Sequence, residues 1–229
     1  MKPEPSTVKL EPPEESAKVT RGLLTCGILA GPVYVIVGAI EMLARPGYDI
    51  RRHALSLLSN GEWGWVNIAL FITSGLLTIA GAIGMRATMR GSPGGTWGPL
   101  LIGGYGLGLV SAGIFTADPA FGFPPGTPAD AHAISWHGLL HFVSGAVGFL
   151  SLIAACFVFA RRYFALKQRG WAAYSIATGV IFFAAFFGIA SGSQGGPATV
   201  AFVTIAFSVA VVLAWAWISI TAARRRLAA

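Results

Sequence analysis

Residues 135–160 read SWHGLLHFVSGAVGFLSLIAACFVFA, and this stretch decides the fold because it is a long apolar run. Two histidines lie near its start. A helix needs about 20 predominantly apolar residues to cross roughly 30 Å of bilayer hydrocarbon. The stretch is long enough to do so, and it contains no aspartate, glutamate, lysine or arginine. We therefore predict a membrane-spanning helix with His137 and His141 in its first turns.

Five further apolar runs of similar length accompany this segment. Of the 229 residues in the chain, 55% are hydrophobic and 11% are charged, whereas soluble domains carry about 25% charged residues. The sequence therefore predicts an all-α polytopic membrane protein, a bundle of six transmembrane helices. The other predicted spans are Leu23–Leu43, Gly64–Met85, Gly98–Phe115, Trp171–Ala190 and Ala198–Ile220.

Glycines recur four residues apart within three of the predicted spans. Small residues at this spacing let helix backbones approach closely in a membrane. We interpret them as packing sites inside the bundle, with a dimer interface as the lesser alternative. The pairs are Gly27 and Gly31, Gly104 and Gly108, and Gly188 and Gly192.

Basic residues are distributed unevenly between the two sides of the predicted spans. Thirteen of the 16 lysines and arginines precede the first span, follow the last one, or lie in the second and fourth loops. Positive residues are retained in the cytoplasm, so we predict that both termini are cytoplasmic. We therefore interpret the net charge of +7 as orienting the protein in the lipid bilayer, and we do not expect nucleic acid as a partner.

The chain divides into one membrane domain and two short tails. Residues 1–20 are rich in Pro, Glu and Lys and have little apolar surface to bury, which predicts a disordered cytoplasmic tail. We predict that residues 21–222 form the six-helix membrane domain and that residues 223–229 form a basic cytoplasmic tail. No long internal repeat is evident.

The first extracytoplasmic loop, residues 45–65, has the pattern of a short helix. Asp49 can cap its start, and Asn60 with the glycine after it can end it. His53, Ser56 and Asn60 share one side, while the apolar residues share another. The pattern predicts a short amphipathic helix in the membrane interface, with His53 and Ser56 on its wet side. The apolar side carries Ile50, Ala54, Leu57 and Leu58.

The third loop, residues 115–132, is irregular and apolar at the same time. Its four prolines and two glycines exclude a regular helix. Phe121 and Phe123 give it apolar side chains, and irregular backbone exposed to lipid is costly. We therefore expect this loop to fold back over the helix ends as a cap.

Ionisable residues near the extracytoplasmic ends of the spans form the candidate metal site. His137 and His141 are four residues apart, so their imidazoles project from one face of a helix. This spacing lets two imidazoles share one tetrahedral metal, zinc above all. A third ligand would come from Asp118, Glu41 or His53, and we predict Asp118. Water would occupy the fourth position.

A metal-bound water with a pKa near neutrality is a hydrolytic nucleophile. The sequence therefore predicts a hydrolase-like site in which Asp118 helps to hold the metal and the water. Ser56 or Glu41 would orient the substrate, which we expect to be a lipid or an amide.

Structural roles for the same residues stay open. His137 and His141 can instead donate hydrogen bonds to loop carbonyls, and Asp118, which precedes a proline, can initiate a turn. Glu41 and Arg45 are four residues apart, and this spacing favours a local ion pair.

The loops also resemble those of a known family. The signatures are RPGYD from Arg45, LSLLSxGExGW ending at Trp65, DPAxGFPPG from Asp118 and HGxxH from His137. Over roughly residues 22–222 the chain is similar to the prokaryotic membrane family catalogued as domain of unknown function 998. The resemblance implies a six-span fold in a prokaryotic plasma membrane, and it implies no particular activity.

A weaker similarity is to the alkaline ceramidase and adiponectin-receptor superfamily of membrane hydrolases, which implies zinc and a hydrolytic reaction. Ser56, His53, Asp118, His137 and His141 supply the residue types that this superfamily places around zinc. The sequence departs from it in having six spans rather than seven. His53 also precedes Ser56 in a loop, where the superfamily has Ser before His in a helix.

Three functions follow from these observations. The first is the metal-dependent membrane hydrolase. The second is a non-enzymatic binding or sensing protein, or an accessory subunit with a membrane-protein partner, in which the His and Asp residues fasten loops to helices. The third is a transporter. We rank it last because a transporter needs ionisable residues near the midplane of several spans. The centres of the second, fifth and sixth spans hold only Ser, Thr and aromatic residues in such places.

Overall fold

The computed structural model describes residues 14–131, 133–193 and 195–228, and in these ranges the chain forms six long helices and one short 3-10 helix, η1 (Leu55–Ser59). All six long helices are long and apolar enough to cross a membrane. The predicted all-α, six-span bundle is therefore confirmed. The helices are α1 (Glu14–Ala44), α2 (Gly64–Thr88), α3 (Trp97–Ile114), α4 (Trp136–Ala165), α5 (Arg169–Gly192) and α6 (Pro197–Arg226).

The first and last helices extend beyond the predicted membrane domain. α1 begins at Glu14, so residues 14–20 are helical, although we predicted them as disordered tail; residues 1–13 lie outside the described part. Acidic residues favour a helix N-terminus, and the Lys18 ammonium lies 2.7 Å from the Glu14 carboxylate one turn away. α6 likewise continues to Arg226 into the predicted basic tail, because arginines complement the dipole at a helix C-terminus.

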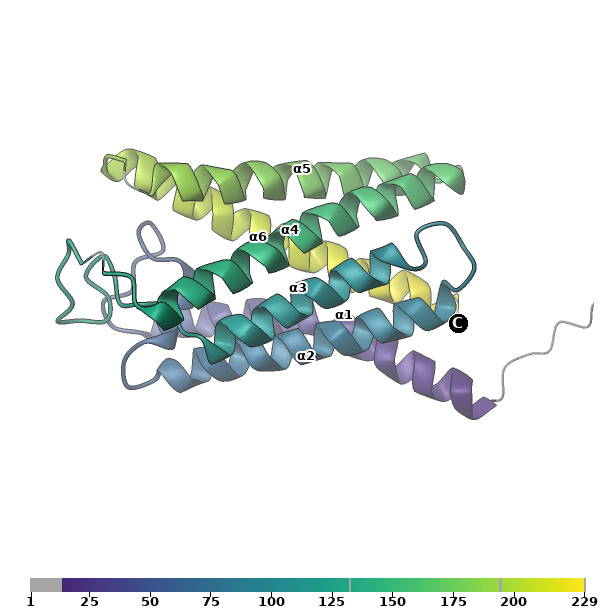
Figure 1. Cartoon of the computed structure of the whole chain (residues 1–229), viewed down its shortest axis with the longest axis horizontal. Helices are drawn as coiled ribbons and strands as arrows, with labels where there is room; N and C mark the ends of the chain where they lie inside the picture. Colours follow the sequence, from purple (N-terminus) through teal and green to yellow (C-terminus); the bar gives the residue numbers. More distant parts are fainter. Residues whose placement is uncertain (1–13, 132, 194, 229) are drawn as a thin grey trace, which may run out of the picture.

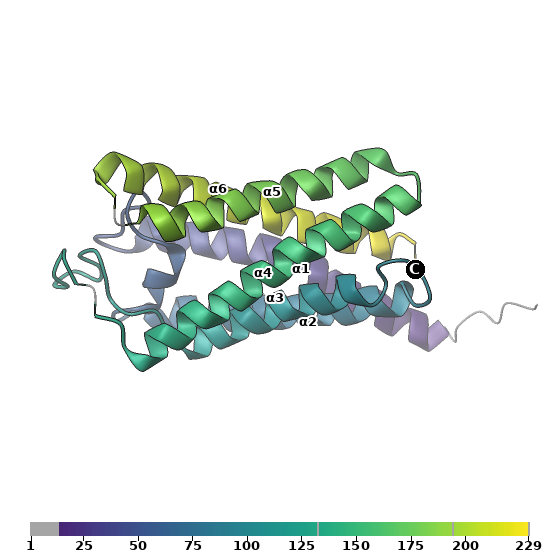
Figure 2. The same ribbon diagram turned by 45° about the horizontal axis from the view of Figure 1, so that its top comes forward.

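The six helices are arranged as a ring. Each packs against its neighbours in the chain, and α1 also packs against α6 and closes the ring. Figures 1 and 2 show the long loops at one end, here called the loop end, and the two termini at the other. α4 crosses the bundle obliquely, close to α3 at the loop end and close to α5 at the opposite end.

Glycine pairs bring the first four helices into close contact. An added Cβ atom at any of the paired glycines would lie 2.5–3.4 Å from the nearest backbone atom of its partner's helix. The predicted intrachain packing is confirmed for the glycines at 27, 31, 104, 108 and 192, but it is wrong at Gly188, where no atom lies within 4 Å of an added Cβ. The pairs are Gly27 with Gly81, Gly75 with Gly106, and Gly108 with Gly148.

Aromatic side chains make the contacts between the later helices. The ring of Phe149 on α4 meets three phenylalanine rings edge-on, with centroid separations of 5.3–5.5 Å. Edge-to-face rings of this kind are mutually attractive and bulky. They hold α4, α5 and α6 together through side chains instead of through backbone contact. The three rings are Phe182, Phe186 and Phe207.

Candidate functional site

The first loop does not form the predicted amphipathic α-helix. The N–H groups of Arg52 and His53 both donate to the Asp49 carbonyl and close a turn. Ala54 is then extended, with φ −68° and ψ 151°, and only Leu55–Ser59 becomes helical, as the 3-10 helix η1. Two residues of the predicted apolar side, Leu57 and Leu58, are nevertheless buried.

His53 is buried rather than on a wet side, so that prediction was wrong. Its Nδ1 atom accepts from the Asp49 N–H at 2.9 Å, and its Nε2 atom lies 3.1 Å from the Phe121 carbonyl. With Nδ1 acting as acceptor, Nε2 carries the proton and donates to Phe121. Burial lowers the pKa of His53. The imidazole is therefore a neutral link between the first and third loops.

The predicted local ion pair between Glu41 and Arg45 is not formed. Glu41 is buried, and its Oε2 atom accepts from Asn67 Nδ2 on α2 at 3.0 Å. The Arg45 guanidinium instead donates to the carbonyls of Leu58, at 2.9 Å, and Asn60, at 2.5 Å. Both side chains therefore tie α1 to neighbouring elements, which the spacing along one helix could not reveal.

The third loop folds over the helix ends as predicted. Phe123 is fully buried, and Tyr48 of the first loop meets it edge-on at 5.7 Å between centroids. The Arg45 guanidinium lies 5.4 Å from the Phe123 ring centroid. Asn60 Nδ2 donates to the Ala117 carbonyl at 3.0 Å. The two loops thus form one unit, which we call the loop cap (residues 45–63 and 115–131).

Asp118 fastens this cap to the start of α4. Its two carboxylate oxygens accept from the Ser135 N–H at 2.8 Å and from the Ser135 hydroxyl at 2.6 Å. Ser135 is the N-cap of α4, and its hydroxyl oxygen accepts from the Gly138 N–H at 3.1 Å. An added Cβ at Gly138 would collide with the Asp118 carboxylate. The acid thus occupies the N-terminus of a helix, where a negative charge is stabilising.

Both histidines of α4 bond to the end of α3. His141 is buried, and its Nδ1 atom lies 2.8 Å from the Phe115 carbonyl and 3.0 Å from the Ala112 carbonyl, so Nδ1 carries the proton and donates. His137 is half-exposed, and its Nδ1 atom lies 3.3 Å from the Thr116 carbonyl. These bonds match the structural role that the sequence left open for the pair.

The predicted zinc ligands do not converge on one point. Asp118 Oδ1 lies 3.8 Å from His137 Nδ1, the nitrogen that already faces a carbonyl. Among the described residues, no group of three His, Cys, Asp or Glu side chains could hold a metal ion. The donor set does not fit zinc as we predicted it.

A cavity of about 780 Å³ lies inside the ring, beneath the loop cap. All six helices contribute to its wall, which is mainly apolar. The few polar groups on it include His141 and Ser144 from α4 and Ser56 from η1. Small residues such as Gly38 and Gly145 leave the space that the larger side chains do not fill.

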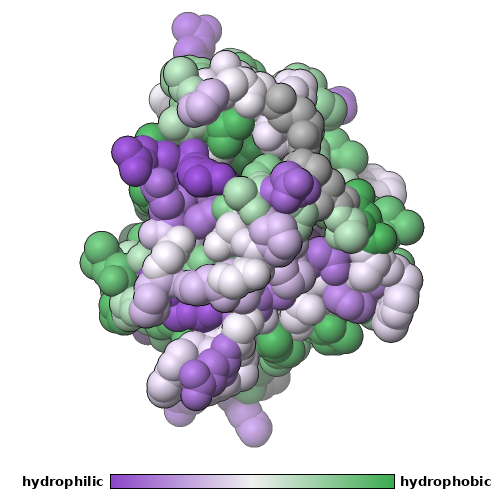
Figure 3. Space-filling view, turned by 90° about the vertical axis from the view of Figure 1, so that its left-hand side faces the viewer, coloured by the Kyte–Doolittle hydropathy of each residue, from purple (hydrophilic) through white to green (hydrophobic). Residues whose placement is uncertain are grey.

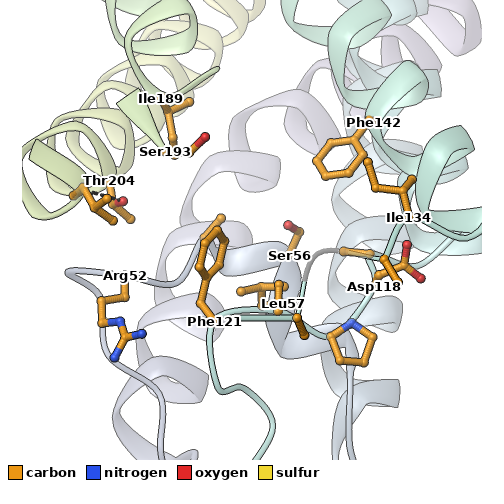
Figure 4. Close-up of a pocket in the computed structure, with 17 residues that line it drawn as sticks. Arg52, Ser56, Leu57, Asp118, Phe121, Ile134, Phe142, Ile189, Ser193 and Thr204 are labelled. Carbon is orange, nitrogen blue, oxygen red and sulfur yellow. Dashed lines mark hydrogen bonds between the residues drawn. The ribbon is translucent and has the colours of Figure 1, made fainter. Parts of the chain in front are cut away.

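A smaller pocket of about 220 Å³ lies at the loop end and shares part of this wall. We call it the vestibule. Figure 4 shows Arg52 and Phe121 on one side of it, Asp118 on the other, and the α5 and α6 residues Ser193 and Thr204 above Arg52. Figure 3 looks onto the same end, where hydrophilic residues cover much of the face and hydrophobic residues gather toward its rim.

The structure therefore separates the predicted site residues into two groups. Ser56 lines both the cavity and the vestibule, Asp118 lines the vestibule, and His141 lines the cavity. Glu41 and His137 line neither of the two spaces. The cavity itself was missed, because its wall is assembled from all six helices and no local pattern in the sequence marks it.

Six membrane-length apolar helices define an integral membrane protein that associates with a lipid bilayer. A family model described as "Protein of unknown function (DUF998)" matches residues 28–224, so the chain belongs to that family, as its loop signatures predicted. No curated protein and no solved structure matches the chain. The weaker similarity to the alkaline ceramidase and adiponectin-receptor superfamily gains no support from these comparisons.

Proposed function

We propose that this protein is a non-enzymatic binding protein that takes an apolar or amphiphilic molecule from the bilayer into its central cavity. The observation that carries the proposal is the cavity of about 780 Å³ with its mainly apolar wall. Small-molecule sites in proteins have volumes of roughly 300–1,000 Å³ and mostly apolar linings with a few polar groups. The central cavity fits this description.

The side of the cavity formed by α4 and α5 supports access from the bilayer. Phe142 of α4 lines the cavity and is 58% exposed, and Ile189 of α5 lines it and is partly exposed. α4 leans toward α3 at this end and away from α5 (Figures 1 and 2). A molecule dissolved in the surrounding lipid would meet this side of the bundle first.

The orientation in the membrane is part of the proposal. Basic residues flank the helices mainly at the end that holds the termini, and positive residues are retained in the cytoplasm. We therefore place the termini in the cytoplasm of a prokaryotic cell and the loop cap on the outer face of its plasma membrane. The cavity would then be reached from the outer leaflet.

The structural roles of the site residues favour binding over hydrolysis. Asp118 accepts two hydrogen bonds from Ser135, and both α4 histidines donate to carbonyls at the end of α3. The metal-dependent hydrolase stays a prediction from the sequence, and a metal analysis of the purified protein tests it. Stoichiometric zinc that disappears when His137 and His141 are both changed to Ala would favour the hydrolase.

Filling the cavity tests the proposal. Gly145 lines the cavity, and an added Cβ there would meet only Phe149, at 3.8 Å. Gly145→Phe should therefore place a ring in the cavity without displacing backbone. We expect lipid extraction and mass spectrometry of detergent-purified protein to find about one tightly held lipid per wild-type chain and at least tenfold less in the variant.

Gly188→Phe is the matched control, because no atom lies within 4 Å of an added Cβ there and Gly188 does not line the cavity. This variant should retain the lipid. Equal lipid content in Gly145→Phe and wild type, with both proteins folded, would contradict the proposal. Wild-type protein that holds no lipid and gains no thermal stability from added lipid would contradict it as well.

A further inference from the structure

Within the proposed function, we infer that the bound molecule is an anionic phospholipid, with its phosphate at Arg52 in the vestibule and an acyl chain in the central cavity. The inference rests on the proposed binding role and adds the chemical class of the ligand. It depends on the adjacency of the two spaces, on the absence of a partner for Arg52 beside a paired Arg51, and on the position of Arg52 at the loop end.

The vestibule and the cavity adjoin one another, because they share lining residues from four parts of the chain. In the proposed binding mode, one molecule extends from the cavity into the vestibule past these shared residues. An elongated amphiphile fits such a shape, with its chain in the larger apolar space and its head in the smaller one. The shared residues are Ala54, Ser56, Phe121, Phe142, Ile189 and Ser193.

Arg52 supplies the charge that would recognise an anion. The neighbouring Arg51 is engaged, because its Nε and Nη2 atoms each donate at 3.0 Å to the two oxygens of Asp49. Arg52 lines the vestibule, and its guanidinium forms no hydrogen bond or ion pair with any other residue in the described part of the chain. A guanidinium presents a fork of N–H donors that matches a phosphate.

The other polar groups of the vestibule are compatible with a phosphate near Arg52. The Asp118 carboxylate would repel an anion, but Figure 4 places it across the vestibule from Arg52, and its oxygens already accept from Ser135. The hydroxyls of Ser56 and Ser193 line the same space, and neither donates to another described residue. Both are available as additional donors to phosphate oxygens.

Arg52 also lies at the end of the bundle that suits a headgroup. Trp63 and Trp65, which follow the same loop, are 57% and 62% exposed at the start of α2. Exposed tryptophans gather at the level of lipid headgroups. An arginine at this depth meets the phosphate of a lipid whose chain reaches inward beside α4.

Competition between lipids with identical dioleoyl chains tests the inference. Delipidated protein in mild detergent is titrated with phosphatidylglycerol, phosphatidylethanolamine or phosphatidylcholine, and bound lipid is counted by native mass spectrometry. We expect phosphatidylglycerol to bind most tightly. Arg52→Gln should weaken its binding about fivefold, the change expected when one arginine near the membrane surface is lost. Arg51→Gln, whose partner is Asp49, is the matched control and should keep the preference.

The outcomes separate this inference from the proposed function. If all three lipids bind equally and Arg52→Gln changes nothing, the inference is overturned while cavity binding stands. A preference for a zwitterionic lipid would overturn it too. If no lipid binds, the proposed function itself fails. Glycerol phosphate in excess should not displace the lipid; if it does, the site recognises a free phosphate and the lipid assignment is wrong.

Discussion

The two halves of the helix ring are built in different ways. Between α1 and α4, consecutive helices touch through paired glycines, and half of the residues in the 18-residue apolar segments of α2 and α3 are buried. Between α4 and α6, phenylalanine rings make many of the contacts, and only 28% of the residues in the 18-residue apolar segment of α5 are buried. Backbone contact at glycines joins the helices of the first half, whereas packing of phenylalanine rings joins those of the second.

This difference shows how one bundle can combine close helix packing with an internal cavity. Small residues permit close approach and therefore many van der Waals contacts, which are the main force between helices in lipid. The loop cap is anchored where those contacts end, through Asp118 and the α4 histidines. The cavity lies inside the ring and is lined by all six helices, including Gly108 and Gly148 of one glycine pair.

The largest expected effect comes from disrupting the glycine-packed half. An added Cβ at Gly75 would lie 2.6 Å from the Gly106 carbonyl oxygen on α3, a backbone atom that cannot turn away. Gly75→Val should therefore lower the free energy of unfolding by about 3 kcal/mol or prevent assembly. Thermal unfolding in detergent, followed by circular dichroism, measures the loss.

The control for this variant is Gly188→Val in the aromatic half. An added Cβ there meets no atom within 4 Å, so the stability of this variant should stay within about 0.5 kcal/mol of wild type. Equal losses at both glycines would show that helix propensity, and not close approach, separates the two halves.

A smaller effect is expected where the cap is anchored. Asp118→Ala removes both hydrogen bonds to Ser135 and the charge at the start of α4. Bonds to a charged group contribute about 1.5–3 kcal/mol, so we expect a loss of about 2 kcal/mol in the same unfolding measurement. Asp130→Ala, in the exposed part of the third loop, should leave stability unchanged. If both variants unfold like wild type, Asp118 has no anchoring role.

The smallest effect concerns the link between the two loops. Because burial lowers the pKa of His53, the unfolded chain binds the proton more readily than the folded chain does. The stabilisation by neutral His53 is therefore complete above the usual pKa of 6.5 and is lost as the pH falls through the lower folded pKa. The melting temperature of wild type should fall between pH 7.5 and pH 5.

His53→Gln isolates this contribution from the other histidines. The melting temperature of the variant should fall less over the same range, because glutamine does not titrate. Asp49, whose pKa is lowered mainly by its hydrogen bonds with Arg51, stays ionised throughout the range. Identical pH profiles for the two proteins would mean that the His53 link does not contribute to stability.

The candidate site was only partly predictable. The spacing of His137 and His141 correctly placed both on one face of α4, and their bonds to carbonyls just after α3 were one of the two open interpretations. The burial of His53 was not predictable, because it depends on the Phe121 carbonyl, 68 residues away in the chain. The structural interpretation of Glu41, an ion pair with Arg45 four residues later, was wrong, because its partner is Asn67 on α2.

The sequence by itself determined that this chain crosses a bilayer six times, because the length of an apolar run and its lack of charge are local properties that alone decide whether a helix spans lipid. It also determined the family, through loop signatures that are contiguous in the chain. Only the tertiary structure decided which glycines touch, which groups donate hydrogen bonds to Asp118, and where the cavity lies. Those features depend on side chains from different helices meeting in space, and the order of residues along one helix does not contain that information.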